Sequence, residues 1–201
     1  TYALFIRLNI DPTAPSTLIV ERFRALDQCI SEVLKQFNEF SLHKGVEGRV
    51  ILYLHGGAYV MGSRNTHRGL AARVARHARA HVLVPDYRLA PENPFPAAVE
   101  DATAAYRWLL DEGYDPTQIA LCGDSAGGGL SLATMVNVKN LGLPQPACAM
   151  LMSPWADLSL SGSSMSEYDG VDCILTRQAL DKMATNYLGD RDRKAPLASP
   201  L

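Results

Sequence analysis

The chain has 201 residues, of which 47% are hydrophobic and 20% are charged, and its formal net charge is -2. This composition is typical of a soluble globular protein with a sizeable core, and it excludes a disordered chain. The near-neutral charge argues against nucleic acid or a membrane surface as a partner, and no apolar run is long enough to cross a membrane.

Cysteine usage indicates the compartment. The four cysteines lie far apart and form no CxxC pair, so neither a zinc site nor a disulfide scaffold is predicted; they are Cys29, Cys122, Cys148 and Cys173. No signal peptide is visible at the start of the chain. A reduced, cytoplasmic location is therefore the expectation.

The first 40 residues are predicted to form a helical lid segment, because apolar residues recur at helical intervals between Thr17 and Phe40. Residues 41–201 are predicted to form an incomplete α/β core. A second lid segment is expected at about residues 163–188, where Thr176 is the predicted N-cap of a helix over residues 178–188.

Four short apolar runs in the centre of the chain have the near-continuous hydrophobicity of strands buried on both faces. They comprise residues 50–54, 81–84, 118–122 and 147–152. Their spacing of about 30 to 37 residues fits β-α-β units with right-handed crossovers. Helical patterns separate them, marked by Leu70 to Ala78, by Val99 to Leu109, and from Ser125 to about Lys139. The sequence therefore predicts an α/β fold with a mostly parallel sheet and flanking helices.

The motif Gly123-Asp124-Ser125-Ala126-Gly127-Gly128 follows the third of these strands and opens a helix. In a G-x-S-x-G elbow the chain turns so sharply that the serine is presented at the end of the sheet, and glycines avoid clashes with the neighbouring strand and helix. The helix N-terminus favours negative charge that develops near the serine. Taken alone, the motif is also compatible with a glycine-rich turn that carries an incidental serine.

A second glycine-rich motif, His55-Gly56-Gly57-Ala58-Tyr59, follows the first strand. An acyl-transfer enzyme holds an oxyanion with preorganised backbone N–H groups. We expect these groups to belong to Gly57, Ala58 and Ala126, and we expect His55 and Gly56 to support the loop. With both motifs in this order, the sequence predicts that Ser125 is a catalytic nucleophile.

Cofactor and metal chemistry have no motif of their own. There is no P-loop and no G-x-G-x-x-G, so no nucleotide site is predicted. His77 and His81 are four residues apart, but helix gives way to strand between them and no third ligand is near, so no metal is expected. His43 and His67 are expected at the surface. No cofactor is predicted.

In combination, the two motifs resemble those of the hormone-sensitive-lipase-like family of α/β-hydrolases, which includes bacterial carboxylesterases and acetyl hydrolases. The resemblance runs from about residue 50 to the end, and it extends over residues 85–92, 95–98 and 153–158. Ala58 replaces the third glycine of the commonest family pattern. Because the expected donor there is a backbone N–H, alanine need not harm it.

The resemblance also assigns supporting roles. In such a fold, Arg88, Glu92 and Asp101 are expected to fix the loop that lies close under the oxyanion loop, without acting as catalysts. Trp155 and Asp157 are expected to shape or support the floor of the pocket. Only residues 31–49 are available for the strand pair that the family usually has before the HGG strand, which is short for that purpose.

The resemblance implies a serine carboxylic ester hydrolase that acts on short-chain acyl esters or lactones through an acyl-enzyme. Its partner would be a small-molecule ester. In the family, the acid and the histidine of the triad lie on later strands, and no histidine follows Ser125 here. We therefore expect the C-terminal part to be missing, the 201 residues alone to be inactive, and the strand at residues 147–152 to be an uncovered sheet edge.

Two alternatives stay open. One is a non-catalytic ligand receptor of the same fold, as in the plant gibberellin receptor, which keeps the elbow but not the working histidine. The other is an inactive truncated fragment. A histidine after the last strand of the sheet would favour the enzyme. The sequence predicts no oligomeric state.

Overall fold

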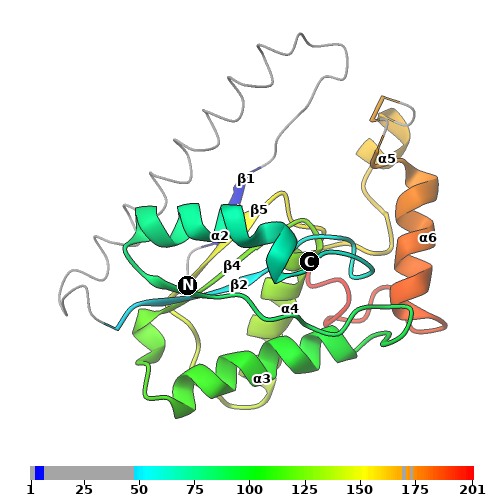
Figure 1. Cartoon of the computed structure of the whole chain (residues 1–201). Helices are drawn as coiled ribbons and strands as arrows, with labels where there is room; N and C mark the ends of the chain where they lie inside the picture. Colours follow the sequence, from blue (N-terminus) through cyan, green and yellow to red (C-terminus); the bar gives the residue numbers. More distant parts are fainter. Residues whose placement is uncertain (1–2, 7–47, 169–170, 173) are drawn as a thin grey trace, which may run out of the picture.

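The computed structural model describes residues 3–6, 48–168, 171–172 and 174–201. Strands and helices alternate along the centre of the chain (Figure 1). The elements are β1 (Ala3–Ile6), β2 (Val50–Leu54), α2 (Arg64–Ala78), β3 (His81–Leu83), α3 (Ala97–Asp111), the 3-10 turn η2 (Pro116–Gln118), β4 (Ile119–Asp124), α4 (Ala126–Asn140), β5 (Cys148–Met152), α5 (Ser164–Glu167) and α6 (Arg177–Leu188). The predicted α/β fold with a parallel sheet and flanking helices is confirmed.

The sheet has five strands in the order β1-β5-β4-β2-β3, and every neighbouring pair is parallel. The register places Leu54, the last residue of β2, beside Gly123 of β4. The segments that leave the carboxyl ends of these two strands are the two glycine-rich motifs. Parallel pairing in this register therefore brings the two motifs to the same edge of the sheet.

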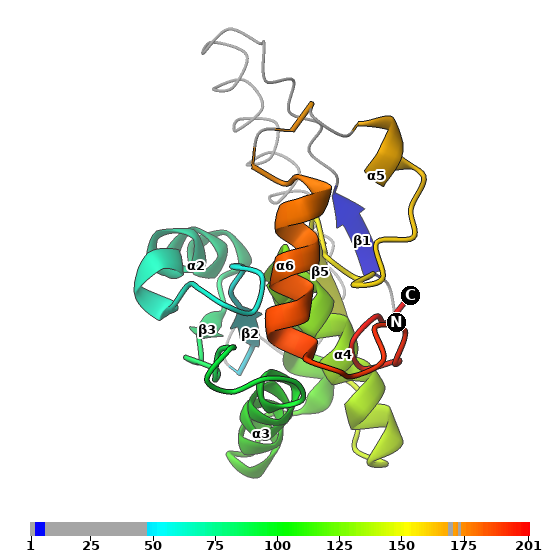
Figure 2. The ribbon, with the colours of Figure 1, turned by 90° about the vertical axis from the view of Figure 1, so that its right-hand side faces the viewer.

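The expected open edge at β5 is wrong. Ala3–Ile6 form β1, which pairs in parallel with β5 from Ala3 beside Ala149 to Ile6 beside Met152 (Figure 2). A neighbouring strand satisfies the backbone N–H and C=O groups that an edge strand would leave unpaired. These four residues thus belong to the sheet and not to a helical lid. The rest of the predicted N-terminal lid, up to residue 40, lies outside the described residues.

Helices cover both faces of the sheet: α2 lies on one side, and α3 and α4 lie on the other (Figure 1). Alternate side chains of each strand point to opposite faces. One set packs beneath α2 and includes Ile51, Tyr53, Cys122, Met150 and Met152. The other set packs against α3 and α4 and includes Leu52, Leu54, Ile119, Leu121 and Leu151. All residues of β2 are buried, as predicted for a strand covered on both faces.

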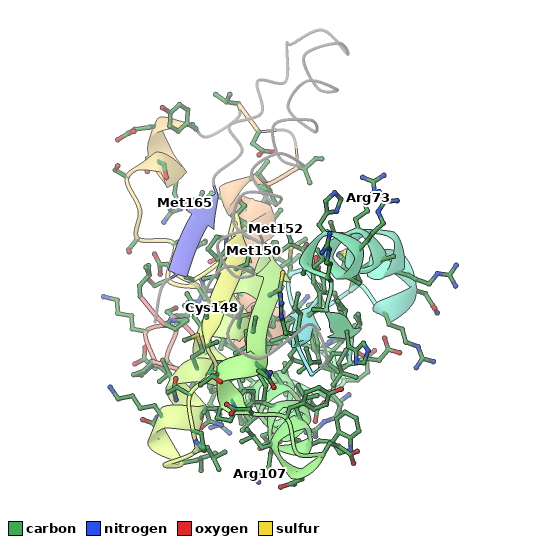
Figure 3. The ribbon with its side chains drawn as sticks, turned by 90° about the vertical axis from the view of Figure 1, so that its left-hand side faces the viewer. Arg73, Arg107, Cys148, Met150, Met152 and Met165 are labelled. Carbon is green, nitrogen blue, oxygen red and sulfur yellow. The ribbon has the colours of Figure 1, made fainter. Side chains whose placement is uncertain are left out.

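Three sulfur-containing side chains, those of Cys148, Met150 and Met152, lie along β5 (Figure 3). In the same view, Arg73 and Arg107 point outward from the helices. Cys122 and Cys148 are free thiols. Burial raises the pKa of the Cys148 thiol to about 11, so it is protonated at neutral pH.

Within the described ranges, no helix is long and apolar enough to cross a membrane.

The start of α6 agrees with the sequence. The Thr176 hydroxyl accepts a hydrogen bond from the Ala179 N–H at 3.1 Å, which is the predicted N-cap interaction. At the start of α2, Ser63 and Thr66 form a capping box that the sequence analysis did not predict. Both helices begin where a hydroxyl side chain satisfies an N–H group that has no partner within the helix.

Candidate active site

Ser125 lies at the sharp turn between β4 and α4 with a φ of 50° and a ψ of -121°. This left-handed conformation is uncommon for a residue other than glycine and costs of order 1–3 kcal/mol. Backbone hydrogen bonds hold it: the Ser125 N–H donates to the Met152 carbonyl at 2.9 Å, and its own carbonyl accepts from the Trp155 N–H at 2.8 Å. The Ser125 hydroxyl does not cap the helix, so it stays available for other chemistry.

The glycines of this elbow are required by close backbone contacts. A Cβ atom on Gly123 would lie 2.3 Å from the Gly127 carbonyl oxygen, and one on Gly127 would lie 2.0 Å from the Leu54 carbonyl oxygen. A Cβ on Gly128 would lie 2.8 Å from the Cβ of Pro154. The first turn of α4 thus packs directly on the end of β2, where the second motif begins.

Replacing Gly127 with alanine should lower the free energy of unfolding of the 201-residue chain by about 3 kcal/mol, because overpacking against rigid backbone reaches the upper end of the usual cost. Gly69 is the matched control: it also lies in a helix, and a Cβ there meets nothing within 4 Å. Gly69→Ala should stabilise the chain by about 0.5–1 kcal/mol. Urea unfolding followed by circular dichroism measures both changes, and similar values for the two variants would contradict the packing argument.

The second motif forms a tight turn with left-handed backbone. Gly57, Ala58 and Tyr59 have φ values of 123°, 54° and 64°. The Gly57 carbonyl accepts hydrogen bonds from the N–H groups of Val60 and Met61, both at 3.0 Å. Among the described residues, the Gly57 and Ala58 N–H groups have no acceptor. The N–H of Ala126, as the first residue of α4, has no carbonyl partner within the helix. These three N–H groups therefore have no acceptor among the residues that the structure describes and could donate to an anion.

His55 lies against this turn. Its Nδ1 is 2.8 Å from the Gly56 carbonyl oxygen, and since a carbonyl only accepts, Nδ1 carries the proton. The Tyr87 hydroxyl donates to the His55 carbonyl at 2.6 Å, and the two rings stack at 4.3 Å. The imidazole is thus committed to the backbone of the loop, in the place where the sequence predicted a supporting residue.

Burial lowers the pKa of His55 below its usual value of 6.5, against the opposing effect of the hydrogen bond to Gly56. At a pH just below 6.5, the folded chain therefore binds fewer protons at His55 than the unfolded chain does. The free energy of unfolding should fall as the pH drops below about 6.5 through the histidine range, before the carboxylates titrate. Urea midpoints between about pH 8 and pH 5 measure this slope.

The matched variant for this measurement is His55→Asn, whose amide keeps a donor near the Nδ1 position but does not titrate. Its slope should be shallower than that of the unmodified chain. All other titratable residues are the same in both chains. Equal slopes would mean that another group carries the pH dependence.

The loop between β3 and α3 supports the turn at its other end. The Ala90 N–H donates to the Tyr59 carbonyl at 2.9 Å. Arg88 pairs with Asp101 at 2.7 Å and with Glu100 at 3.0 Å. Glu92, the third residue predicted to fix this loop, is exposed and forms no ion pair with any described residue. Arg88 and Asp101 therefore have the contacts of scaffold residues, whereas Glu92 does not.

Two residues beside the site were missed by the sequence analysis. The Asp124 carboxylate accepts hydrogen bonds from the Gly56 N–H at 3.0 Å and from the Tyr53 hydroxyl at 2.7 Å. His67 was expected at the surface and is half-buried instead: its side chain is 19% exposed, and its Nε2 lies 3.5 Å from the Asp124 carboxylate. Its spacing of four from the buried Ala71 places it on the inner face of α2, a signal that could have found it.

Helix α6, part of the predicted second lid segment, contacts the same turn. Tyr187 stacks on Tyr59 with ring centroids 3.9 Å apart and meets the Phe95 ring edge-on at 5.8 Å. The Phe95 N–H donates to the Tyr187 carbonyl at 2.7 Å. Burial raises the pKa of the Tyr187 phenol, so it remains neutral. An aromatic cluster thus joins α6 to the glycine-rich turn.

Trp155 and Asp157 lie just after β5. The indole N–H of Trp155 donates to the Asp157 carbonyl at 3.1 Å, and its ring centroid is 6.3 Å from that of Tyr59. The Asp157 carboxylate accepts from the backbone N–H and hydroxyl groups of Ser159 and Ser161. Partial burial alone would raise the pKa of Asp157, but these hydrogen bonds lower it overall. Asp157 therefore orders its own loop.

The histidines that could have formed a metal pair have other partners. His77 Nδ1 is 2.8 Å from the Arg73 carbonyl oxygen, and His81 Nδ1 is 3.3 Å from the Tyr114 hydroxyl. In the part of the chain that the structure describes, no group of three histidine, cysteine or acidic residues is arranged to hold a metal ion.

Known proteins resemble this chain over the region that carries both motifs. A sequence profile for the α/β-hydrolase fold matches residues 51–201. An acetyl-hydrolase from Streptomyces hygroscopicus is 47% identical over 154 residues. A solved esterase of the bacterial hormone-sensitive lipase family is 49% identical with a TM-score of 0.71, and the match covers 76% of this chain and 52% of that one. The structure of EstE5 soaked with p-nitrophenyl butyrate is 52% identical with a TM-score of 0.71, covering 77% and 52%.

The chain spans about half the length of the curated relatives that it matches. The match to the Streptomyces acetyl-hydrolase covers 77% of this chain but 52% of that protein. The matched residues include both glycine-rich motifs and the strands that precede them.

Proposed function

The chain belongs to the hormone-sensitive-lipase-like family of α/β-hydrolases, the carboxylesterases and acetyl-hydrolases, and on this premise we propose that Ser125 is the nucleophile of a serine ester hydrolase. The oxyanion hole consists of the N–H groups of Gly57, Ala58 and Ala126. His55 and Gly56 support it. By the full-length protein we mean a chain that contains these 201 residues and is as long as the relatives.

One observation carries the proposal. The strained Ser125 lies on one motif, and the Gly57 and Ala58 N–H groups, which have no acceptor within the described part of the chain, lie on a second motif in direct contact with it. Gly127 of the elbow packs on the carbonyl oxygens of Leu54 and His55, at 2.0 and 2.6 Å from an ideal Cβ position. A nucleophile beside preorganised N–H donors is the minimum machinery of acyl transfer.

The reaction proceeds through an acyl-enzyme. The Ser125 Oγ attacks the ester carbonyl carbon while its proton passes to a histidine, and the carbonyl oxygen becomes an oxyanion held by the three N–H groups. The C–O bond to the alcohol then breaks, and the alcohol leaves with the proton. Water attacks the acyl-enzyme in the same way and releases the acid. In the family order, the histidine and its acid follow the serine; no histidine follows Ser125 in these residues.

We infer that the substrates are short-chain acyl esters or lactones. Tyr59, Tyr187 and Trp155 crowd the turn that supplies the oxyanion donors, which favours small acyl groups. The related EstE5 was soaked with p-nitrophenyl butyrate. In the full-length protein, kcat/KM for p-nitrophenyl acetate or butyrate should exceed that for the laurate ester by at least about tenfold. Initial rates over an acyl-chain series measure this, and a preference for laurate would contradict the short-chain assignment.

The second candidate is a non-catalytic ligand receptor of the same fold. A fluorophosphonate probe distinguishes the two. The probe labels Ser125 in a working hydrolase of full length, because the nucleophile is activated. A receptor binds small ligands without being labelled.

A further inference from the structure

We propose that Asp124 is a positioning residue, whose carboxylate fixes the Gly56 N–H and thereby aims the Gly57 N–H toward the oxyanion. The inference rests on the proposed function, because an oxyanion forms only if Ser125 attacks a carbonyl. Asp124 precedes Ser125 directly and is the last residue of β4. Its side chain nevertheless reaches to β2 and to the turn that follows it.

The peptide between His55 and Gly56 is held at both of its polar groups. Its carbonyl oxygen accepts from the Tyr87 hydroxyl at 2.6 Å, and its N–H donates to Asp124 Oδ1 at 3.0 Å. A peptide unit is planar, so two such contacts fix the direction of the plane.

The next peptide is the one that presents a donor. Its carbonyl, on Gly56, accepts from His55 Nδ1 at 2.8 Å. In a trans peptide the N–H points opposite to the carbonyl, so the direction of the Gly57 N–H follows from this contact. The orientation of His55 depends in turn on the preceding peptide, which Asp124 and Tyr87 hold. Asp124 therefore acts through Gly56 on the donor.

Steric fit supports the same assignment. A Cβ on Gly56 would lie 2.2 Å from Asp124 Oδ2 and 3.0 Å from the Asp124 backbone oxygen. The turn thus rests on the carboxylate, and only glycine allows this approach. The other donor to Asp124 Oδ1 is the Tyr53 hydroxyl, which lies beneath the sheet-facing side of α2 and does not belong to the turn.

The acceptor oxygen of Asp124, and not its negative charge, should determine kcat. A negative charge near the site would itself disfavour an oxyanion. Asp124→Asn keeps an acceptor oxygen, whereas Asp124→Leu has a similar size and no acceptor. In the full-length protein, Asp124→Leu should lower kcat for p-nitrophenyl butyrate by about 10²-fold, the effect of losing one oxyanion donor. KM should stay within about threefold, because the oxyanion exists only in the transition state. Asp124→Asn should stay within about fivefold of the unmodified kcat.

Tyr53→Phe is the matched control, because it removes the other donor to the same oxygen without touching the turn; its kcat should stay within about threefold. If Asp124→Leu does not fold, Asp124→Ala replaces it. In the 201-residue chain, hydrogen exchange of the Gly56 N–H should be at least about tenfold faster in the Asp124→Ala variant than in the unmodified chain. An unchanged kcat and unchanged exchange without the acceptor would overturn the proposal, as would an asparagine variant as impaired as leucine.

Ser125→Ala in the same assay separates this inference from the proposed function. If Ser125→Ala retains turnover, the proposed function fails, whatever Asp124 does. If Ser125→Ala is inactive and Asp124→Leu is fully active, only the positioning role of Asp124 fails.

Discussion

Ser125→Ala in the full-length protein should reduce kcat for p-nitrophenyl butyrate by about 10⁶-fold, the size of effect known for the serine of a protease with the same triad logic. Labelling by a fluorophosphonate should disappear with it. The reason is that no other atom of the elbow can form the covalent bond to the acyl group. Ester turnover and intact-mass measurement of probe attachment test the two effects separately.

The variant should fold like the unmodified chain, so the loss is chemical. Alanine carries the same Cβ as serine, so the steric strain of a φ of 50° should be similar, and the hydrogen bonds described for the turn are made by the backbone of Ser125. Ser131→Ala is the control on the same helix, because the Ser131 hydroxyl donates to the Gly127 carbonyl of its own helix at 2.8 Å. Its turnover should be close to normal. A Ser125→Ala variant that kept labelling and turnover would contradict the assignment.

The three central strands β2, β4 and β5 could be predicted because burial on both faces leaves near-continuous apolar runs in the sequence, whereas the predicted strand that became β3 is an edge strand with an exposed and two half-buried residues. Residues 50–54 coincide with β2. The predicted strand at residues 118–122 begins and ends too early, because β4 is Ile119–Asp124. Its apolar run stops at Cys122, but backbone pairing continues, with Gly123 beside Leu151 and Asp124 beside Met152. Hydrogen bonds between strands do not require an apolar side chain, so the pattern underestimates the strand.

The supporting contacts of the site could not be read from local patterns. Asp124 and Gly56 are 68 residues apart, and which strands become neighbours decides that they meet. The same holds for β1, whose four residues pair with β5. Periodicity reports which face of an element is buried but not what lies across from it. The motifs predicted the residues around Ser125, whereas the tertiary fold decides how Asp124, Tyr87 and Tyr187 surround them.

The 201 residues by themselves should hydrolyse p-nitrophenyl butyrate poorly. Without a general base, the serine hydroxyl is a weak nucleophile. In a protease with this machinery, loss of the triad leaves only about 10³- to 10⁴-fold acceleration over water, from the oxyanion hole and binding. We expect the 201-residue chain to stay at or below that level, whereas the full-length protein turns the ester over at a rate typical of its family.

The described histidines are poorly placed to replace the missing base. His55 donates Nδ1–H to the Gly56 carbonyl, and its Nε2 is buried. His67 directs Nε2 toward the Asp124 carboxylate at 3.5 Å. His77 and His81 bond to Arg73 and Tyr114. A proton acceptor must lie within hydrogen-bond reach of the nucleophile, and each of these rings has a partner elsewhere.

The comparison of the two rates requires that the 201-residue chain be folded, and in this chain β5 is not an open edge, because it pairs with β1. Calorimetry on both chains establishes a cooperative transition before rates are compared. Adding imidazole as an external base should then raise the turnover of the short chain but not that of Ser125→Ala in the same chain, because only the unmodified serine can use the base. Family-like turnover by the 201 residues without imidazole would contradict the prediction and would place the base among the histidines before Ser125.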